Sequence, residues 1–164
     1  METANVKVCF VCLGNICRSP MAEGIMKSLI RGARLHDQIE VDSAGTGAYH
    51  VGSPPDRRAW EASRARGVSL NTEARQFTAE DFAAFNYVIA MDSENREDLA
   101  DVAPDAAAHA KIHLLRAFDP AAPSGAEVPD PYYGGPRGFD NVFDMCEAAC
   151  QGLLKTIRTD HKLP

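Results

Sequence analysis

The segment from Cys12 to Ser19 carries the residue types that phosphate chemistry needs. It reads Cys-Leu-Gly-Asn-Ile-Cys-Arg-Ser, so an arginine follows the first cysteine at the sixth position. A loop between a strand and a helix can turn its backbone N–H groups toward an anion, and the N-terminus of the helix adds partial positive charge. Arg18 can add a forked guanidinium that binds two oxygens of the same anion. We therefore expect a binding site for a tetrahedral dianion.

Cys12 is the candidate nucleophile of this loop. Surrounding hydrogen-bond donors and positive charge favour the thiolate, which is the reactive form of cysteine. Ser19 can donate a hydroxyl hydrogen bond to that sulfur. No Lys follows the glycine, so the loop does not match the GxxxxGK[ST] nucleotide-binding motif. The alternative is a cysteine packed at a strand end beside a surface arginine, and the strand and helix around the loop favour the chemical interpretation.

Short apolar segments alternate with helical patterns along the chain. We expect strands at 6–11, 39–43, 87–91 and 111–115, and helices at 20–32, 53–67, 78–85, 93–102 and 140–159. Strands that alternate with helices imply right-handed crossovers and a parallel sheet. The expected fold class is thus α/β, a single domain over 1–164 with a four-stranded parallel sheet flanked by helices on both sides. Ligands of such folds bind at the carboxyl ends of the strands, where the Cys12 loop follows strand 1.

Composition and charge restrict the partners. The chain has 164 residues, of which 45% are hydrophobic and 24% charged, as in ordinary globular domains. The net charge of -6 argues against nucleic acid or an anionic membrane as the main partner. We see no apolar run near the ~18 residues of a membrane span and no signal-peptide pattern. Five cysteines, an odd number, fit a reducing cytoplasm better than a disulfide framework.

Residues 11–23 resemble the active-site signature of the low-molecular-weight protein tyrosine phosphatases. Further segments resemble the family in the same order, and the resemblance runs from about residue 6 to 157: Asp42–Thr46, His50–Gly52, Pro55–Asp56, Ala74–Gln76, Ala90–Asp92 and Asp130–Gly134. The resemblance implies a signalling enzyme that hydrolyses protein phosphotyrosine and small aryl phosphates through a phosphocysteine. It implies no metal and no cofactor. The expected partners are phosphotyrosine proteins and phosphate or similar oxyanions, and we expect a monomer or a weak dimer.

The resemblance also assigns roles to residues. Cys12 would take the phosphoryl group, Arg18 would hold it, and Asp130 would protonate the leaving oxygen and then activate water. The remaining loop and supporting positions would be Leu13, Gly14, Asn15, Ile16, Cys17, Ser19 and Ser43, with Asp92 nearby as support. Tyr49, on the segment that borders the entrance in the family, would help to set substrate preference.

Asp130 can also be judged from its own sequence context. Phosphoester cleavage needs a proton for the leaving group, and a carboxylic acid on a loop over the site can supply it. Asp119, which also precedes a proline on this loop, is the alternative acid. Asp130 is favoured because Tyr132 and Tyr133 follow it and could form the walls of a slot for an aromatic ring.

The other cysteines have simpler interpretations. Cys9 falls inside the first strand, and Cys146 and Cys150 lie four apart on the apolar stripe of the last helix, so all three are expected to be buried thiols. Cys17 either fills space in the loop or, as the resemblance suggests, forms a reversible disulfide with Cys12 that protects it from over-oxidation.

Three other functions compete with the tyrosine phosphatase. Arsenate reductases of this fold need further redox cysteines near the third strand, and residues 77–92 contain none. Phosphoarginine phosphatases typically have Thr after the nucleophile, where this chain has Leu13. A catalytically inactive phosphate-binding module would not need to keep Cys12, Arg18 and Asp130 together.

Overall fold

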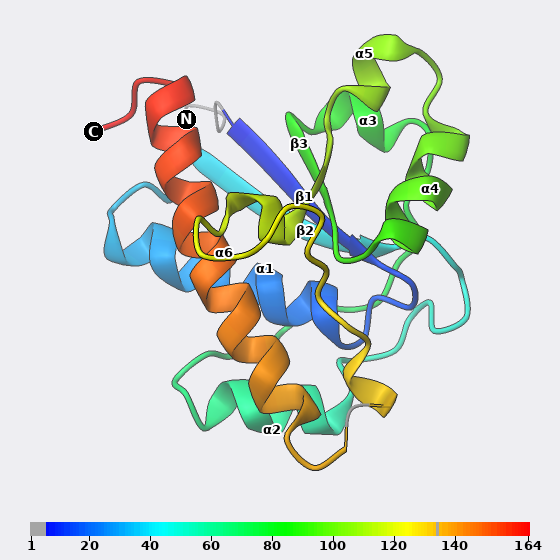
Figure 1. Ribbon diagram of the computed structural model, residues 1–164, viewed down its shortest axis with the longest axis vertical. Helices are drawn as coiled ribbons and strands as arrows, with labels where there is room; N and C mark the ends of the chain where they lie inside the picture. The colour runs from blue at the N-terminus through cyan, green and yellow to red at the C-terminus, as the bar shows by residue number, and fades with distance from the viewer. Residues whose placement is uncertain (1–5, 134) are drawn as a thin grey trace.

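A four-stranded parallel sheet forms the centre of the molecule (Figure 1). The computed structural model describes residues 6–133 and 135–164. The strand order is β2-β1-β3-β4, and every neighbouring pair is parallel, as the sequence predicts. The strands are β1 (Val6–Cys12), β2 (Ile39–Gly45), β3 (Tyr87–Ala90) and β4 (Ile112–Leu114).

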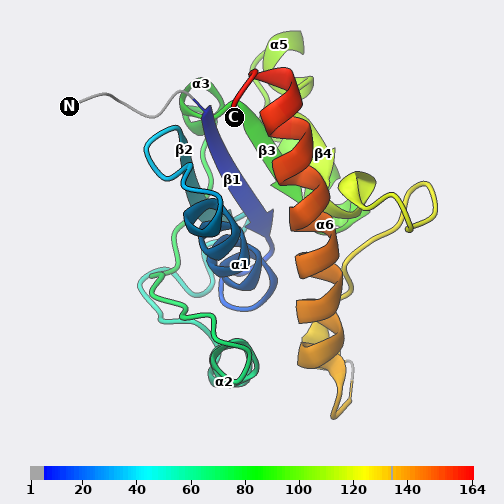
Figure 2. The ribbon, with the colours of Figure 1, turned by 90° about the vertical axis from the view of Figure 1, so that its left-hand side faces the viewer.

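Helices cover both faces of the sheet (Figures 1 and 2). One core joins the sheet to α1, α2 and α6, and a second joins its other face to α3, α4 and α5. The helices are α1 (Arg18–Gly32), α2 (Arg57–Arg64), α3 (Asp81–Ala84), α4 (Ser93–Val102), α5 (Ala106–His109) and α6 (Gly138–Asp160), with 3-10 turns η1 (Leu115–Phe118) and η2 (Pro131–Tyr133). No helix of the described residues has the length and apolar character to cross a bilayer.

Strand β1 is central because its side chains alternate between the two cores. Val8, Phe10 and Cys12 belong to the core under α1 and α6, whereas Cys9 and Val11 belong to the core under α3 and α4. Burial of a side chain such as Phe10 stabilises the fold by about 1.5–3 kcal/mol. The carboxyl end of this buried strand therefore provides a rigid base for the loop that follows it.

Four helices begin at residues other than the expected ones, among them α3 at Asp81 and α6 at Gly138, and the starts of α1 and α2 have clear physical reasons. Helix α1 begins at Arg18 rather than Pro20, but Pro20 still lies in the first turn, where a missing N–H costs no helical hydrogen bond. Helix α2 begins at Arg57 and not near Ser53. The two prolines before it disfavour a helical backbone in the preceding residues, so Asp56 caps the helix instead, and its carboxylate accepts the Arg58 N–H at 2.8 Å.

Three short elements were not expected. Both 3-10 turns lie in or beside residues 119–138, a proline-rich segment that the sequence predicts as a loop. Helix α5 has four residues and is capped by Asp105, whose carboxylate accepts the Ala108 N–H at 2.8 Å. So short a helix has no marked apolar periodicity and depends on tertiary packing, here of the buried Ala108.

Gly152 allows α6 to approach η1 closely. A Cβ atom at this position would overlap the carbonyl oxygen of Phe118. We expect Gly152→Ala to lower the free energy of unfolding by about 1–3 kcal/mol, the usual cost of overpacking. Urea denaturation followed by circular dichroism measures the change.

Gly32 is the matched control for this substitution. It also lies in a helix, but a Cβ added there meets no atom within 4 Å. Gly32→Ala should therefore stabilise the protein by about 0.5–1 kcal/mol through helix propensity. Equal effects of the two substitutions would show that the contact between α6 and η1 imposes no constraint.

Candidate active site

The loop after β1 is held in place from outside. Cys12 ends β1 and Arg18 begins α1, so the loop spans the carboxyl end of the strand and the N-terminus of the helix. The carbonyl oxygens of Cys12 and Ile16 accept the backbone N–H groups of Thr46 and Asp56, each at 2.8 Å. With its carbonyls engaged in this way, the loop has N–H groups to offer an anion, next to the positive end of the α1 dipole.

Asn15 fixes the shape of the loop. Its φ of 56° lies in the left-handed region, which Asn tolerates better than most residues. The buried amide Nδ2 donates to Ser19 Oγ at 2.8 Å and to Ser43 Oγ at 2.9 Å, and Oδ1 accepts the Arg75 N–H at 3.1 Å. All polar atoms of this side chain are thus satisfied, which offsets the cost of the unusual backbone conformation.

The sulfur of Cys12 lies in a buried polar environment. The residue is 3% exposed, and its Sγ lies 3.0 Å from Ser19 Oγ. Ser19 already accepts a hydrogen bond from Asn15, so its own hydroxyl proton is available for the sulfur. Such a donor stabilises a thiolate both as a nucleophile and as a leaving group.

Arg18 is a buried cation that two partners hold in place. Its Nη1 donates to Asp92 Oδ2 at 2.6 Å and to the Val128 carbonyl at 3.0 Å. Burial acts to lower the pKa of Arg18, but the negative charges of Cys12 and Asp92 outweigh it, so the pKa is raised above its ordinary value. Asp92 also caps α4 by accepting the Asn95 N–H at 2.8 Å. The guanidinium is therefore permanently charged and anchored to a second helix.

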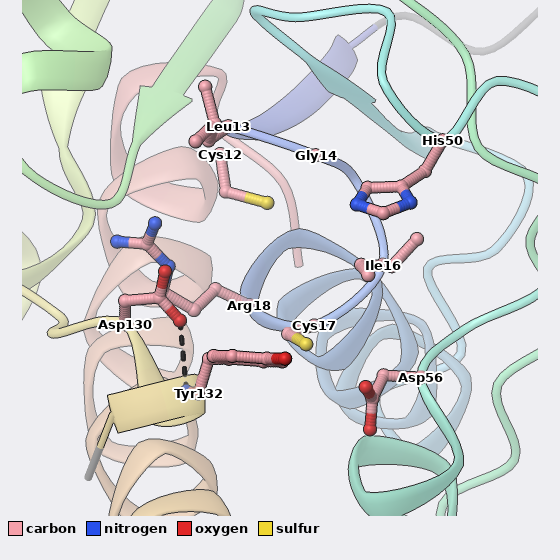
Figure 3. A pocket seen from close by; sticks show the side chains of 10 residues that line it. All are labelled: Cys12, Leu13, Gly14, Ile16, Cys17, Arg18, His50, Asp56, Asp130 and Tyr132. Carbon is pink, nitrogen blue, oxygen red and sulfur yellow. Dashed lines mark hydrogen bonds between the residues drawn. The ribbon is translucent and has the colours of Figure 1, made fainter.

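A cavity of about 450 Å³ opens above this loop (Figure 3). Asp130 and Tyr132 contribute to it from the side opposite Gly14 and His50, and Asp130 Oδ1 accepts the Tyr132 N–H at 2.9 Å. The described residues that line it are Cys12, Leu13, Gly14, Ile16, Cys17, Arg18, His50, Asp56, Asp130 and Tyr132. The cavity thus brings a candidate nucleophile, a cation and a candidate acid together.

Most of the residues expected at the site are at this cavity or directly behind it. Asn15, Ser19 and Ser43 are buried behind the loop and joined by hydrogen bonds. The side chain of Tyr133 falls outside the described part of the chain. Asp119, the alternative acid, lies away from the cavity and accepts the Ala121 N–H of its own turn at 2.9 Å.

In the segment that borders the entrance, His50 lines the cavity, whereas its neighbour Tyr49 is 78% exposed and is not among the lining residues. The role expected of Tyr49 in substrate preference stays a prediction. The His50 ring packs over the loop, because a Cβ on Gly14 would lie 2.9 Å from the ring Cδ2. Asp56 was also missed as a lining residue. Its helix-capping role was the available signal, since a capping residue stands at the end of α2 that meets the loop.

Cys17 lines the cavity as a neutral thiol. Burial, with added repulsion from Asp56 and Cys12, raises its pKa to about 12. Burial also raises the pKa of Cys146 to about 12 and those of Cys9 and Cys150 well above the ordinary value. All five cysteines are free thiols, so the Cys12–Cys17 disulfide stays a prediction. The four thiols other than Cys12 are unsuited to act as nucleophiles near neutral pH.

The parallel sheet and its cysteine–arginine loop define the class of cysteine-dependent phosphatases. Comparison with known proteins agrees with this class. The family model described as "Low molecular weight phosphotyrosine protein phosphatase" matches residues 7–163. The chain belongs to this family, which is a family of hydrolases.

Individual relatives cover almost the whole chain. A low molecular weight protein-tyrosine-phosphatase of Streptomyces coelicolor is 44% identical over 93% of both chains. The human low molecular weight phosphotyrosine protein phosphatase is 40% identical over 94% of this chain and 97% of its own.

Solved structures give the same result and add a related activity. A protein tyrosine phosphatase of Entamoeba histolytica superposes with a TM-score of 0.90 at 40% identity, covering 95% of this chain and 99% of its own. A Drosophila arginine phosphatase superposes with a TM-score of 0.81 at 33% identity, covering 93% and 98%.

The role of Arg18 can be tested with a substitution that keeps its charge. Lysine is a point charge that cannot bind two oxygens through a planar fork, and it would lose the paired contacts to Asp92 and Val128. We expect Arg18→Lys to lower kcat on p-nitrophenyl phosphate by about 10²–10³-fold, as for other transition-state donors.

Arg66→Lys is the control for this loss. Arg66 forms an ion pair with Asp144 at 2.6 Å, away from the cavity. This substitution should leave kcat within about twofold, because a surface ion pair contributes little. Near-wild-type kinetics of Arg18→Lys would contradict the assigned phosphate-binding role.

Proposed function

We propose that this protein hydrolyses phosphotyrosine in proteins, and small aryl phosphates, through a phosphocysteine on Cys12. The observation that carries the proposal is the convergence on one cavity of the Cys12 thiol, the buried Arg18 guanidinium and the Asp130 carboxyl group. Asp130 reaches the cavity from a loop far along the chain, so this arrangement is a product of the fold and not of local sequence.

The first chemical step transfers the phosphoryl group. The loop N–H groups and Arg18 bind the phosphate dianion, and the Cys12 thiolate attacks phosphorus opposite the tyrosine oxygen. The S–P bond forms as the P–O bond breaks. Asp130 gives its proton to the departing phenolate, which leaves as a neutral tyrosine side chain.

The second step returns the enzyme to its starting state. Asp130, now a carboxylate, takes a proton from a water molecule as that water attacks the phosphorus of the phosphocysteine. The S–P bond breaks, inorganic phosphate is released, and Cys12 departs as a thiolate. Ser19, whose Oγ lies 3.0 Å from the sulfur, stabilises this leaving thiolate.

An aromatic leaving group suits the walls of the cavity. Leu13, Ile16 and Tyr132 line it, and the side chains of Leu13 and Tyr132 are exposed. A phenyl ring that enters between these side chains would bury apolar surface on both of its faces.

Phosphoarginine is the second candidate substrate, because the carboxylates of Asp56 and Asp130 also face the cavity and could bind a guanidinium. Leu13, an apolar side chain that lines the cavity, favours phosphotyrosine over phosphoarginine as the substrate.

The remaining assignments complete the proposal. Residues 1–164 act as one catalytic domain, in signalling, as a monomer or weak dimer and without metal or cofactor. A reducing compartment such as the cytoplasm suits a protein whose nucleophile and four further cysteines are free thiols.

Assays with and without EDTA test the metal-independent chemistry, since a chelator should leave kcat unchanged.

Leaving-group basicity tests the assignment of the acid. A general acid matters most for a poor leaving group, so Asp130→Asn should slow phosphorylation of the enzyme by phenyl phosphate by about 10²-fold or more. The nitrophenyl ester, whose phenolate departs readily, should be slowed less than about tenfold. Single-turnover measurements isolate this step from the later hydrolysis, which Asp130 also serves.

Asp119→Asn is the control, because Asp119 also precedes a proline on the same loop but lies outside the cavity. It should show neither loss. If Asp119→Asn shows the dependence on the leaving group and Asp130→Asn does not, the acid is misassigned. If neither variant shows it, another group supplies the proton.

A further inference from the structure

A chain of hydrogen bonds continues from the catalytic loop to a lysine outside the active-site cavity. Glu23, on α1, is 3% exposed, and its Oε1 accepts the hydroxyl of Ser43 at 2.5 Å. Its Oε2 accepts a hydrogen bond from Lys27 Nζ, one turn further along α1, at 2.5 Å. The Lys27 side chain is 49% exposed and lines a separate cavity of about 140 Å³, together with Glu23 and Arg31.

The carboxylate of Glu23 fixes the direction of the first hydrogen bonds. A carboxylate can only accept, so Ser43 must donate its single hydroxyl proton to Glu23. Ser43 Oγ is then an acceptor for the rest of the network, and it receives an N–H from Asn15 at 2.9 Å. The amide of Asn15 is thereby oriented with its nitrogen toward the two serines.

The same direction is passed on to the nucleophile. The second Nδ2 proton of Asn15 goes to Ser19 Oγ at 2.8 Å. Ser19, occupied as an acceptor, can direct its own proton to Cys12 Sγ at 3.0 Å or to the Ala44 carbonyl at 3.5 Å. The sulfur is the nearer acceptor and, as a thiolate, carries the greater negative charge, so the proton points to it.

A buried carboxylate without a counter-ion is unfavourable, and Lys27 supplies that counter-ion to Glu23. We propose that Lys27 is a positioning residue for the phosphatase reaction, because it holds Glu23 as the anion that directs the network's protons toward the Cys12 thiolate. The proposal rests on the proposed function, in which Cys12 is the nucleophile. Neither Lys27 nor Glu23 touches the substrate.

The predicted signature is a slower reaction of Cys12 with an alkylating agent. With Lys27→Met, Glu23 loses its counter-ion, and the hydrogen bond that Ser19 directs to the sulfur is weakened. We expect alkylation of Cys12 by iodoacetamide to be about threefold to tenfold slower than wild type, the factor that corresponds to one weakened hydrogen bond to the reactive thiolate.

The other titratable groups near Cys12 are the same in every variant. Those that line the cavity with it are Cys17, Arg18, His50, Asp56, Asp130 and Tyr132, and Cys146 lies near it on α6. Burial raises the pKa of Cys17 to about 12, so its thiol stays neutral and does not compete for the reagent near neutral pH.

Kinetics on p-nitrophenyl phosphate give a second readout. Lys27→Met should lower kcat by about the same factor as the alkylation rate and leave KM within about twofold, because the phosphate-binding groups are unchanged. Lys27→Arg should restore both readouts, since it restores the cation. A purely structural defect would raise KM as well as lower kcat, and Lys27→Arg would not restore either readout.

Lys7→Met is the matched control. Lys7 is a partly exposed lysine that pairs with a glutamate, Glu40, at 3.6 Å, but it lies on β1 at the end remote from the loop. It should behave as wild type in both assays. In a double-mutant cycle, Glu23→Gln with Lys27→Met should be no worse than Glu23→Gln alone, because both act through one carboxylate.

Two results would overturn the proposal. One is an alkylation rate and a kcat of Lys27→Met equal to those of Lys7→Met, which would make the Lys27–Glu23 ion pair an ordinary surface contact. The other is additive losses in the double-mutant cycle. Failure of the proposed function is distinguishable from both, since it would appear as activity retained by Cys12→Ser whatever residue stands at position 27.

Discussion

The burial of a permanently charged guanidinium at the carboxyl end of β1 is the constraint around which the site is built. Arg18 is 4% exposed, so its charge must be matched by negative groups close by. Asp92 supplies one of them at 2.6 Å and ties the guanidinium to the N-terminus of α4. The Cys12 sulfur and the incoming phosphate can supply the rest. A buried guanidinium without negative partners would destabilise the fold. In this site the same charge favours the Cys12 thiolate and a bound dianion.

The geometry of the loop depends in turn on buried polar groups that surround it. Asn15 adopts a left-handed conformation because Ser19, Ser43 and the backbone of Arg75 satisfy its amide completely. These partners come from α1, β2 and the segment that joins α2 to α3. Since such a network costs stability when it is only partly satisfied, the loop is formed only when the whole fold is formed. Catalytic geometry and folding are thus linked through a few hydrogen bonds.

Sequence alone predicted the parts of the molecule that depend on local patterns. Four apolar segments predicted the parallel sheet, and the spacing of Cys12 and Arg18 predicted the phosphate-binding loop. Both could be predicted because buried strands and anion-binding loops require particular residue types. Side-chain direction in irregular segments leaves no such trace in residue types, so the sequence singled out Tyr49 and did not predict that its neighbour His50 lines the cavity. The Glu23–Lys27 pair has the spacing of an ordinary surface ion pair, and only the packing of α1 on β2 reveals that Glu23 is buried.

Direct observation of the phosphorylated enzyme tests the central claim. The enzyme is mixed with p-nitrophenyl phosphate, quenched in acid within one turnover and digested, and its peptides are analysed by mass spectrometry. We expect one added phosphoryl group on the peptide that contains Cys12, localised to its sulfur, and none in a Cys12→Ser protein treated in the same way. Rapid turnover with the phosphoryl group on another residue, or equal turnover by Cys12→Ser, would contradict the account.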